Sequence, residues 1–151
     1  MSANAPAAPE DGRTAAPSAT AIEDSLKRGL ASVPGLDATL GLQHLRGRGD
    51  SYLRLLRKFA ETRAADVEAM RARIASQDYT GLSSLVHNVQ GVAGFLGAIE
   101  IEALASGVCT AVRTGRDATE IDRLATALID AQSELAAGAL ASIAPVPAAN
   151  K

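Results

Sequence analysis

The sequence has few of the residues that build β-sheets or disulfide frameworks. Its 151 residues include one cysteine, no tryptophan, and only four aromatic side chains: Tyr52, Phe59, Tyr79 and Phe95. A single cysteine, Cys109, excludes an intramolecular disulfide and a cysteine-based metal site. Because aromatic and β-branched residues favour strands, their scarcity argues against a β-sandwich, a barrel or an α/β enzyme.

An excess of positive charge and long apolar runs are also lacking. The formal net charge is −2, whereas nucleic-acid binding favours a basic domain, so we expect no nucleic-acid partner. No run of about 18 apolar residues is present, and the N-terminus lacks the charged and apolar regions of a signal peptide. We therefore expect a cytoplasmic protein that makes no membrane contact through this chain.

Alanine and leucine are abundant, with 32 and 17 copies, and both rank at or near the top of the helix-propensity scale. The composition therefore predicts an all-α fold. Residues 1–20 and 144–151 carry almost no bulky side chains and cannot bury enough surface to offset the entropy of ordering. They are predicted to be disordered tails, the first of them a tail or interdomain linker, around an ordered domain at 22–143.

Capping residues and glycines divide this domain into short N-terminal helices and four long helices. The last four segments span about 18–27 residues and are joined by very short links, which make neighbouring helices antiparallel. We therefore predict an antiparallel up-down four-helix bundle with a short extra N-terminal helix. Arg63 interrupts the apolar stripe of the first long helix, where we expect a bend or a partner-facing position. The predicted helix caps are Asp37, Asp78 and Asp117, and the predicted stops are Gly47, Gly97 and Gly115.

The third long segment, DYTGLSSLVHNVQGVAGFLGA, places one histidine apart from the core. At about 100° per residue its apolar side chains fall within one arc of roughly 80°, and His87 points almost directly away from that arc. The predicted buried face comprises Leu82, Leu85, Val86, Val89, Ala93 and Leu96. The side chains around His87 are mostly small or absent: Ser83, Ser84, Gln90, Gly91 and Gly94.

Two glycines inside a helix each cost roughly 1 kcal/mol relative to alanine. Gly91 and Gly94 therefore suggest clearance, through which another protein's backbone can approach the imidazole. A neutral imidazole is a nucleophile near neutral pH, and the sequence gives His87 no catalytic partner, so the rest of the apparatus must arrive on another molecule. The alternative is that His87 is an ordinary solvated side chain.

Three other side chains have simpler interpretations. His44 is expected to be an ordinary surface residue near the end of a short helix. Phe95 lies on the flank of its helix, where it either packs against a neighbouring helix or anchors a partner beside His87. Cys109 borders an apolar stripe and is expected to be inert packing.

The segment HNVQGVAGFLGA resembles the phosphoacceptor helix of histidine-containing phosphotransfer (HPt) domains of bacterial phosphorelays. That family shows His-x-x-Lys-Gly, then small residues, then Leu-Gly-Ala. The upstream segment PGLDATLGLQHLRGRGDSYLRLLRKF resembles the family's lead-in, and AIEIEALASGVCTAVRTGRD resembles its fourth helix. The resemblance covers about residues 34–135.

The resemblance implies that His87 accepts a phosphoryl group, on its ε2 nitrogen, from a receiver-domain aspartate and passes it to another receiver's aspartate. The implied partners are response-regulator receiver domains and a hybrid sensor histidine kinase. The Mg²⁺ ion and an assisting lysine would sit on the receiver, so the chain itself would need no cofactor or metal and would act as a monomeric phosphocarrier, not as an enzyme on its own. Gly91 carries over as the clearance residue, and Ser83, Ser84 and Phe95 are expected partner contacts.

The chain departs from the family at Gln90, which stands where the family has its lysine. The resemblance places this side chain in contact with the phosphoryl oxygens, where a glutamine offers only a neutral hydrogen bond. Charge-assisted hydrogen bonds contribute about 1.5–3 kcal/mol and neutral ones about 0.5–1.5 kcal/mol. We therefore predict a less stable phosphohistidine, or a nearby arginine that replaces the lysine.

Two alternative functions remain open at this point. One is a helical-bundle adaptor that regulates a receiver or kinase without carrying phosphate, which the missing lysine would allow. The other is the phosphoacceptor domain of a chemotaxis-type kinase, which has the same fold. A self-contained ATP-dependent kinase is excluded, since the chain has no glycine-rich nucleotide motif and no room for such a domain.

Overall fold

The computed structural model describes residues 19–143, all of whose regular structure is helical. Two short helices, α2 (Ala19–Leu30) and α3 (Ala38–His44), precede four long ones. The long helices are α4 (Gly49–Ala75), α5 (Tyr79–Leu96), α6 (Ile99–Arg113) and α7 (Ala118–Ile143). The predicted all-α fold with four long helices is confirmed.

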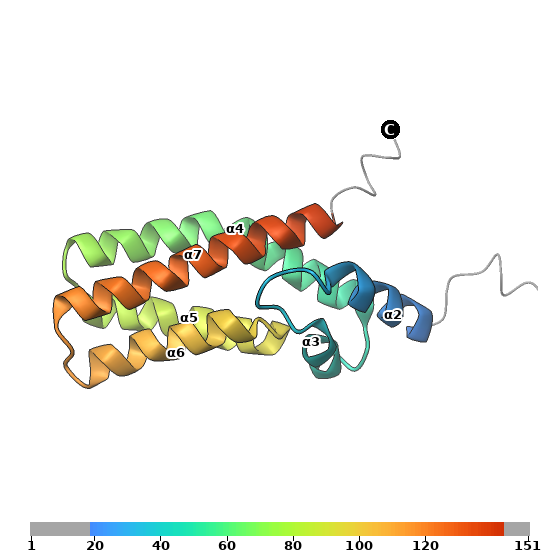
Figure 1. The fold of residues 1–151 in the computed structure, drawn as a ribbon, viewed down its shortest axis with the longest axis horizontal. Helices are drawn as coiled ribbons and strands as arrows, with labels where there is room; N and C mark the ends of the chain where they lie inside the picture. Colours follow the sequence, from blue (N-terminus) through green and yellow to red (C-terminus); the bar gives the residue numbers. More distant parts are fainter. Residues whose placement is uncertain (1–18, 144–151) are drawn as a thin grey trace, which may run out of the picture.

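The four long helices alternate in direction and form a closed bundle (Figure 1). Each packs against the next along the chain, and α7 returns to pack against α4. The short helices α2 and α3 lie together at one end of the bundle, beside the end of α5 and the start of α4 (Figure 1). Within residues 19–143, no helix is both long and apolar enough to cross a membrane.

The outermost described helices begin and end near the bounds predicted for the ordered domain. The first helix begins at Ala19, so the last two residues of the predicted tail are helical. The last helix ends at Ile143. The remaining parts of the two predicted tails, 1–18 and 144–151, lie outside the described residues.

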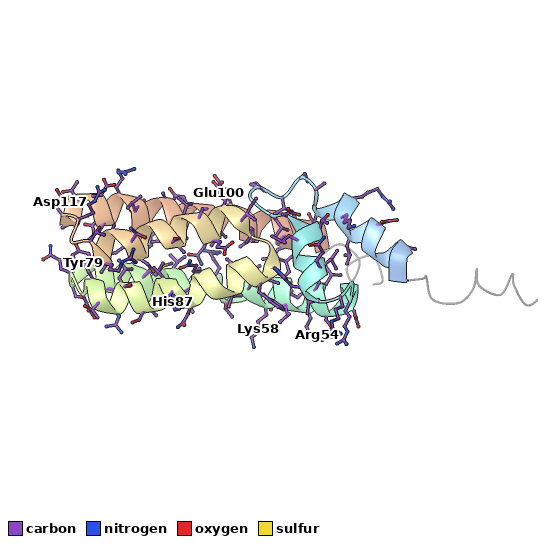
Figure 2. The ribbon with its side chains drawn as sticks, turned by 90° about the horizontal axis from the view of Figure 1, so that it is seen from below. Arg54, Lys58, Tyr79, His87, Glu100 and Asp117 are labelled. Atoms are coloured by element: carbon purple, nitrogen blue, oxygen red, sulfur yellow. The ribbon has the colours of Figure 1, made fainter. Side chains whose placement is uncertain are left out.

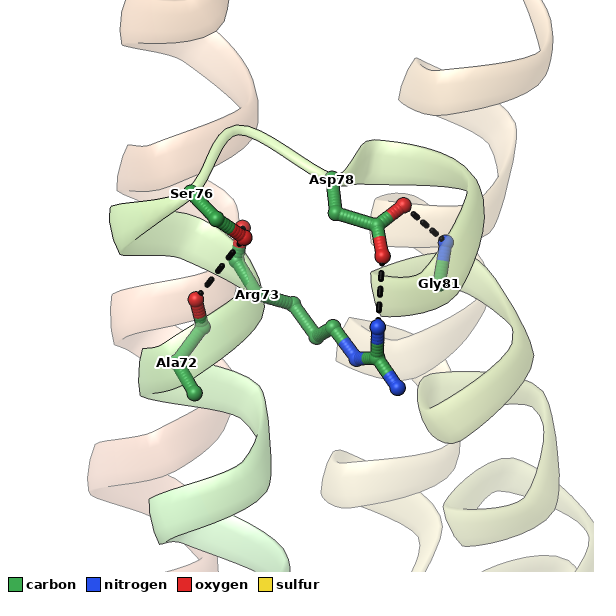
Figure 3. A network of polar contacts seen from close by, with 5 residues as sticks. All are labelled: Ala72, Arg73, Ser76, Asp78 and Gly81. Atoms are coloured by element: carbon green, nitrogen blue, oxygen red, sulfur yellow. Dashed lines mark hydrogen bonds and ion pairs between the residues drawn. The ribbon is translucent and has the colours of Figure 1, made fainter.

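Asp78 fixes the start of α5. Its carboxylate accepts the backbone N–H of Gly81 at 2.9 Å and pairs with the Arg73 guanidinium of α4 at 2.6 Å (Figure 3). The N–H of Gly81, followed by Arg73, lowers the pKa of this carboxyl below its usual value. In the same turn, the Ser76 hydroxyl donates to the carbonyl of Ala72 at 3.1 Å. The cap therefore sets where α5 begins relative to α4, and the predicted caps Asp37 and Asp117 make the same bond to the residue three positions on.

The other end of α5 is held by groups from α3, α4 and the loop before α3. Gly97 ends the helix in the left-handed region, at a φ of 85°. A Cβ at Gly97 would collide with the carbonyl of Asp37, so both the conformation and the space require glycine. The buried Tyr52 hydroxyl donates to the carbonyl of Leu96 at 2.8 Å, and the N–H of Asp37 donates to the carbonyl of Gly97 at 2.7 Å. The last carbonyls of α5 are thus satisfied inside the fold.

The interior is built from small and aliphatic side chains of all four long helices. The predicted buried face of α5 is confirmed: Leu82, Val86, Val89, Ala93 and Leu96 are buried and Leu85 is half-buried. Helix α4 continues through Arg63 without a break, and this half-buried arginine keeps a buried Nε atom without a hydrogen-bond partner among the described residues. Gln132 of α7, which the pattern did not single out, is completely buried, and both its amide atoms likewise have no partner within residues 19–143.

Tyr52 offers a test of the contact that holds the end of α5. Burial, followed by the charge of Asp37, raises the pKa of the Tyr52 phenol, so the group stays a neutral donor. Tyr52→Phe leaves the carbonyl of Leu96 without its donor, and we expect the free energy of unfolding to fall by about 1–3 kcal/mol. Urea denaturation followed by circular dichroism measures this loss.

The matched control is Tyr79→Phe, whose hydroxyl donates to Asp122 at a partly exposed site. This variant should change stability much less, because water can replace the lost bond. Equal denaturation midpoints for the Tyr52 variant and the unchanged protein would show that the bond does not hold the helix end.

Candidate functional site

His87 lies in the middle of α5, and its side chain is exposed (Figure 2). His87 lies nine residues, about two and a half helical turns, after the Asp78 cap. Because the cap fixes the first turn of α5, it also fixes the side of the helix on which the imidazole lies. Between Tyr79 and Leu96 the helix carries no aspartate, glutamate, lysine or arginine. The imidazole is therefore the one titratable side chain on α5 other than the Tyr79 phenol, and no ion pair on its own helix restrains it.

The residues one turn from His87 are small or polar, as predicted. Ser84 and Gly91 are exposed, whereas Ser83 and Gln90 are half-buried. The carbonyl of Ser83 accepts a weak hydrogen bond from the Cys109 thiol of α6 at 3.7 Å, so this cysteine lies in the α5–α6 contact. The side chain of Gln90 makes no hydrogen bond to another described residue.

The two glycines beyond His87 differ in what surrounds them. A Cβ added at Gly91 would meet no heavy atom within 4 Å, so the space above this residue is open. A Cβ added at Gly94 would lie 2.7 Å from a carboxylate oxygen of Glu102 on α6. Glu102 therefore occupies the space beside Gly94, and clearance for a partner at this glycine stays a prediction.

Phe95 and His44 form a pair that the sequence did not indicate. Their rings stack at a centroid distance of 5.4 Å with 16° between the planes. His44 Nδ1 lies 2.7 Å from the carbonyl of Phe95, and because a carbonyl can only accept, this nitrogen carries the proton and donates. Phe95 keeps 42% of its surface exposed. It thus packs against a neighbouring helix, as one of its two interpretations proposed, and still presents a large apolar face to solvent.

A groove runs between α4 and α5 on one side of His87. Its volume is about 690 Å³. Buried apolar side chains form its floor, and Leu55, Val92 and Phe95 stand exposed at its edge. Gly91, one turn from His87, also lines it, so the groove and the imidazole share one continuous surface. The lining residues are Leu55, Lys58, Phe59, Thr62, Asp66, Met70, Leu85, Asn88, Val89, Gly91, Val92, Phe95 and Leu96.

The polar residues of the groove come mainly from α4. Lys58 is exposed, whereas Asp66 is half-buried. This burial raises the pKa of the Asp66 carboxyl above its usual value. Spacing by three and four residues along α4 places Leu55, Lys58, Thr62 and Asp66 on one face, a pattern visible in the sequence. The sequence does not indicate which face of α5 lies opposite these four residues.

The described residues hold no cluster of metal-ligating side chains. Within 19–143 no group of three or more His, Cys, Asp or Glu side chains lies close enough to hold a metal ion. What the site can offer is therefore one exposed nucleophilic nitrogen, open space beside it, and an apolar groove that leads away from it.

Comparisons with known proteins agree with this architecture. The structure resembles the HPT domain of an Hpt sensor hybrid histidine kinase from Shewanella, with a TM-score of 0.65 and 15% sequence identity over 73% of this chain and 97% of that one. At that identity the likeness shows the fold. No curated protein sequence matches the chain. The sequence model of the Hpt domain matches residues 54–141, more than half of the chain and the whole of the segment around His87. The chain therefore belongs to the Hpt domain family, and its role is histidine phosphotransfer in a phosphorelay.

Proposed function

We propose that His87 is the phosphoacceptor, and that it takes a phosphoryl group from a receiver-domain aspartate and passes it to the aspartate of a second receiver. The observation that supports this most directly is the exposed imidazole at the centre of α5, in a chain of the Hpt family, with open space at Gly91. The other histidine, His44, uses its Nδ1 in a hydrogen bond and stacks on Phe95.

The transfer needs little from this chain beyond the imidazole itself. The lone pair of the neutral imidazole Nε2 attacks the phosphorus of the aspartyl phosphate, and the bond between phosphorus and the carboxylate oxygen breaks. The receiver's aspartate leaves as a carboxylate, while His87 Nδ1 keeps its proton. In the second transfer, the aspartate carboxylate of another receiver attacks the phosphorus, the bond between phosphorus and Nε2 breaks, and the imidazole returns to its neutral state.

We assign neutralisation of the phosphoryl group's negative charge to the receiver domain. A transferring phosphoryl group requires cations around its oxygens, and α5 carries none. We place the Mg²⁺ ion and the assisting lysine on the receiver domain, so that the chain is a phosphocarrier with no catalytic activity of its own. Its partners in this proposal are response-regulator receivers and a hybrid sensor histidine kinase.

One alternative has a specific observation in its favour. Because Gln90 replaces the lysine of the family pattern, the second candidate function is a bundle that binds a receiver without accepting phosphate. The two functions differ in one measurable product, an acid-labile phosphate on this chain.

The first test is the appearance of that phosphate. The chain is incubated with the receiver domains of its own source organism, each phosphorylated with acetyl phosphate and freed of excess reagent, in the presence of Mg²⁺. We expect acid-labile, alkali-stable phosphate on the unchanged protein and none on His87→Gln, with His44→Gln as the matched control that retains it. Phosphate that persists on the His87 variant, or that never forms on the unchanged protein, contradicts the proposal.

The second test concerns the space at Gly91. Gly91→Ala should raise the free energy of unfolding by about 0.5–1 kcal/mol, because alanine is favoured over glycine inside a helix and the new methyl meets nothing. The same methyl stands where a receiver must approach, so transfer from the phosphorylated receiver should slow by about tenfold or more. A quenched time course of phosphotransfer measures the rate, and urea denaturation measures the free energy of unfolding.

Gly107→Ala is the control for this pair of effects. A Cβ at Gly107 in α6 also meets nothing within 4 Å, and this position lies 200° around the helix from Cys109, which faces α5. The control should gain comparable stability with an unchanged transfer rate. If Gly91→Ala transfers phosphate as fast as Gly107→Ala, open space at position 91 is not what admits the receiver.

The third test concerns Gln90. Gln90→Lys should lengthen the lifetime of the phosphohistidine by about fivefold, since a charge-assisted hydrogen bond to the phosphoryl oxygens exceeds a neutral one by about 1 kcal/mol. Gln90→Met, which offers no donor, should shorten it. Loss of acid-labile phosphate over time measures the lifetime, and identical decay in all three proteins would show that residue 90 does not contact the phosphoryl group.

A further inference from the structure

Two polar side chains reach the interior of the bundle without a hydrogen-bond partner among the described residues. Gln132 of α7 is completely buried, and neither its amide oxygen nor its amide nitrogen is bonded to another described group. Arg63 of α4 is half-buried, and its Nε atom is buried and unpaired in the same sense. Within residues 19–143, these three atoms are all the buried side-chain nitrogens and oxygens that lack a partner. The unpaired polar atoms therefore come from two helices, α4 and α7.

The two residues lie at a similar depth along the bundle. At one end, Arg73 of α4 pairs with the cap of α5, and the adjacent Tyr79 donates to Asp122 of α7. On α4, which ends there, Arg63 precedes Arg73 by ten residues. On α7, which begins there, Gln132 follows Asp122 by ten residues. At 1.5 Å of rise per residue, both lie about 15 Å from this end.

Both residues also stand on the core side of their helices. Arg63 lies one turn after Phe59 and one turn before Val67, and both of these are buried. Gln132 lies one turn before Leu135, which is buried as well. Helices α4 and α7 pack against each other along the bundle (Figure 1). The buried atoms of Arg63 and Gln132 therefore belong to one polar region in the middle of the contact between α4 and α7.

This region requires a group that both accepts and donates hydrogen bonds. A buried amide or guanidinium N–H without a partner is costly, and nearly all buried polar groups in native proteins bond to protein or to ordered water. The region offers N–H donors from Arg63 and Gln132 and one acceptor, the Gln132 Oε1 atom. An anion would accept from the donors but leave the amide oxygen unpaired. Water pairs with all of them, and buried waters typically make about three hydrogen bonds.

Small side chains flank the two residues. Ala60 lies one turn before Arg63 on α4, and Ala136 lies one turn after Gln132 on α7, both almost completely buried. An alanine fills less of the interior than the leucines at other core positions. The terminal nitrogens of Arg63 are not among the buried unpaired atoms, so its charged end reaches toward the surface while Nε stays inside.

We propose that Arg63 and Gln132 bind one ordered water molecule inside the bundle, between α4 and α7. The water oxygen accepts the Nε–H of Arg63 and an Nε2–H of Gln132, and one water hydrogen is donated to the Oε1 of Gln132. All three unpaired atoms are then satisfied, and a hydrogen-bonded bridge joins the first and last long helices. This site lies outside the machinery assigned to His87, so the inference goes beyond the proposed function and does not depend on it.

The first experiment detects the water on the isotope-labelled, 151-residue chain. Cross-peaks between water and the side-chain N–H protons of Gln132 are recorded in NOE and in rotating-frame spectra. A water held longer than the protein takes to tumble gives cross-peaks of opposite sign in the two spectra, whereas proton exchange with bulk water gives equal signs. We expect opposite signs at Gln132, and no such pair at the exposed Gln77.

Ser133→Ala is the control for this signal. Ser133 is the next residue along α7 and is half-buried. A hydroxyl proton that exchanges with bulk water imitates a bound water when it lies near an amide. We expect the opposite-sign cross-peaks of Gln132 to persist in Ser133→Ala, and their loss would assign the signal to the hydroxyl and overturn the proposal.

The second experiment tests the bridge between the helices with a double-mutant cycle of Arg63→Met and Gln132→Met. Either substitution alone removes one side of the bridge and leaves polar atoms of the other side poorly paired, whereas the double substitution removes both sides. Arg63→Met should therefore change the unfolding equilibrium constant about fivefold less in the Gln132→Met background than in the unchanged protein. Urea denaturation measures the constants, and the exposed Arg71, replaced by Met, gives a control cycle with additive effects.

Each result decides one part of the inference. If Gln132 shows no opposite-sign cross-peaks in the unchanged protein, the water site is wrong, whatever the variants do. If the cycle of Arg63 and Gln132 is as additive as the control cycle, the bridge from α4 to α7 is wrong. Neither result bears on the proposed function, because phosphate on His87 is measured separately.

Discussion

The orientation of α5 is the constraint on which the site depends. Asp78 binds the N–H of Gly81 at its start, and Tyr52 and Asp37 bind its last carbonyls at its end. Between these fixed ends, one apolar face is buried and the opposite face is left to solvent. His87 is exposed because the helix cannot rotate without breaking both sets of contacts, so the interactions that stabilise the fold also determine where the nucleophile faces.

The chemistry of the site follows from how little surrounds the imidazole. A helix without charged side chains gives His87 no internal ion pair, and the glycine one turn on gives a partner room. Most of what phosphoryl transfer requires is positioning and charge neutralisation, which a partner can supply if it docks in one orientation. The groove between α4 and α5 and the Phe95 ring stacked on His44 are the surface features of this chain that lie nearest to the open space at Gly91.

The sequence predicted what depends on local pattern. The four long helices, the aspartate caps of α3, α5 and α7, and the buried face of α5 follow from periodicity and capping chemistry. Features that depend on which helix lies opposite could not be predicted: Gly94 makes room for Glu102, His44 stacks on Phe95, and Gln132 is buried without a partner among the described residues. The first two join residues of different helices, and the burial of Gln132 depends on the helices packed around α7, so no spacing within one segment encodes them.

The most direct test of the central claim is to determine which nitrogen carries the phosphate after transfer from a phosphorylated receiver. Peptide mapping under alkaline conditions distinguishes His87 from His44, and ¹H–¹⁵N spectra of the imidazole rings distinguish Nε2 from Nδ1. The account predicts phosphate on Nε2 of His87 and an unmodified His44. Phosphate on His44, or a receiver that binds the chain and leaves both rings unmodified, would contradict it.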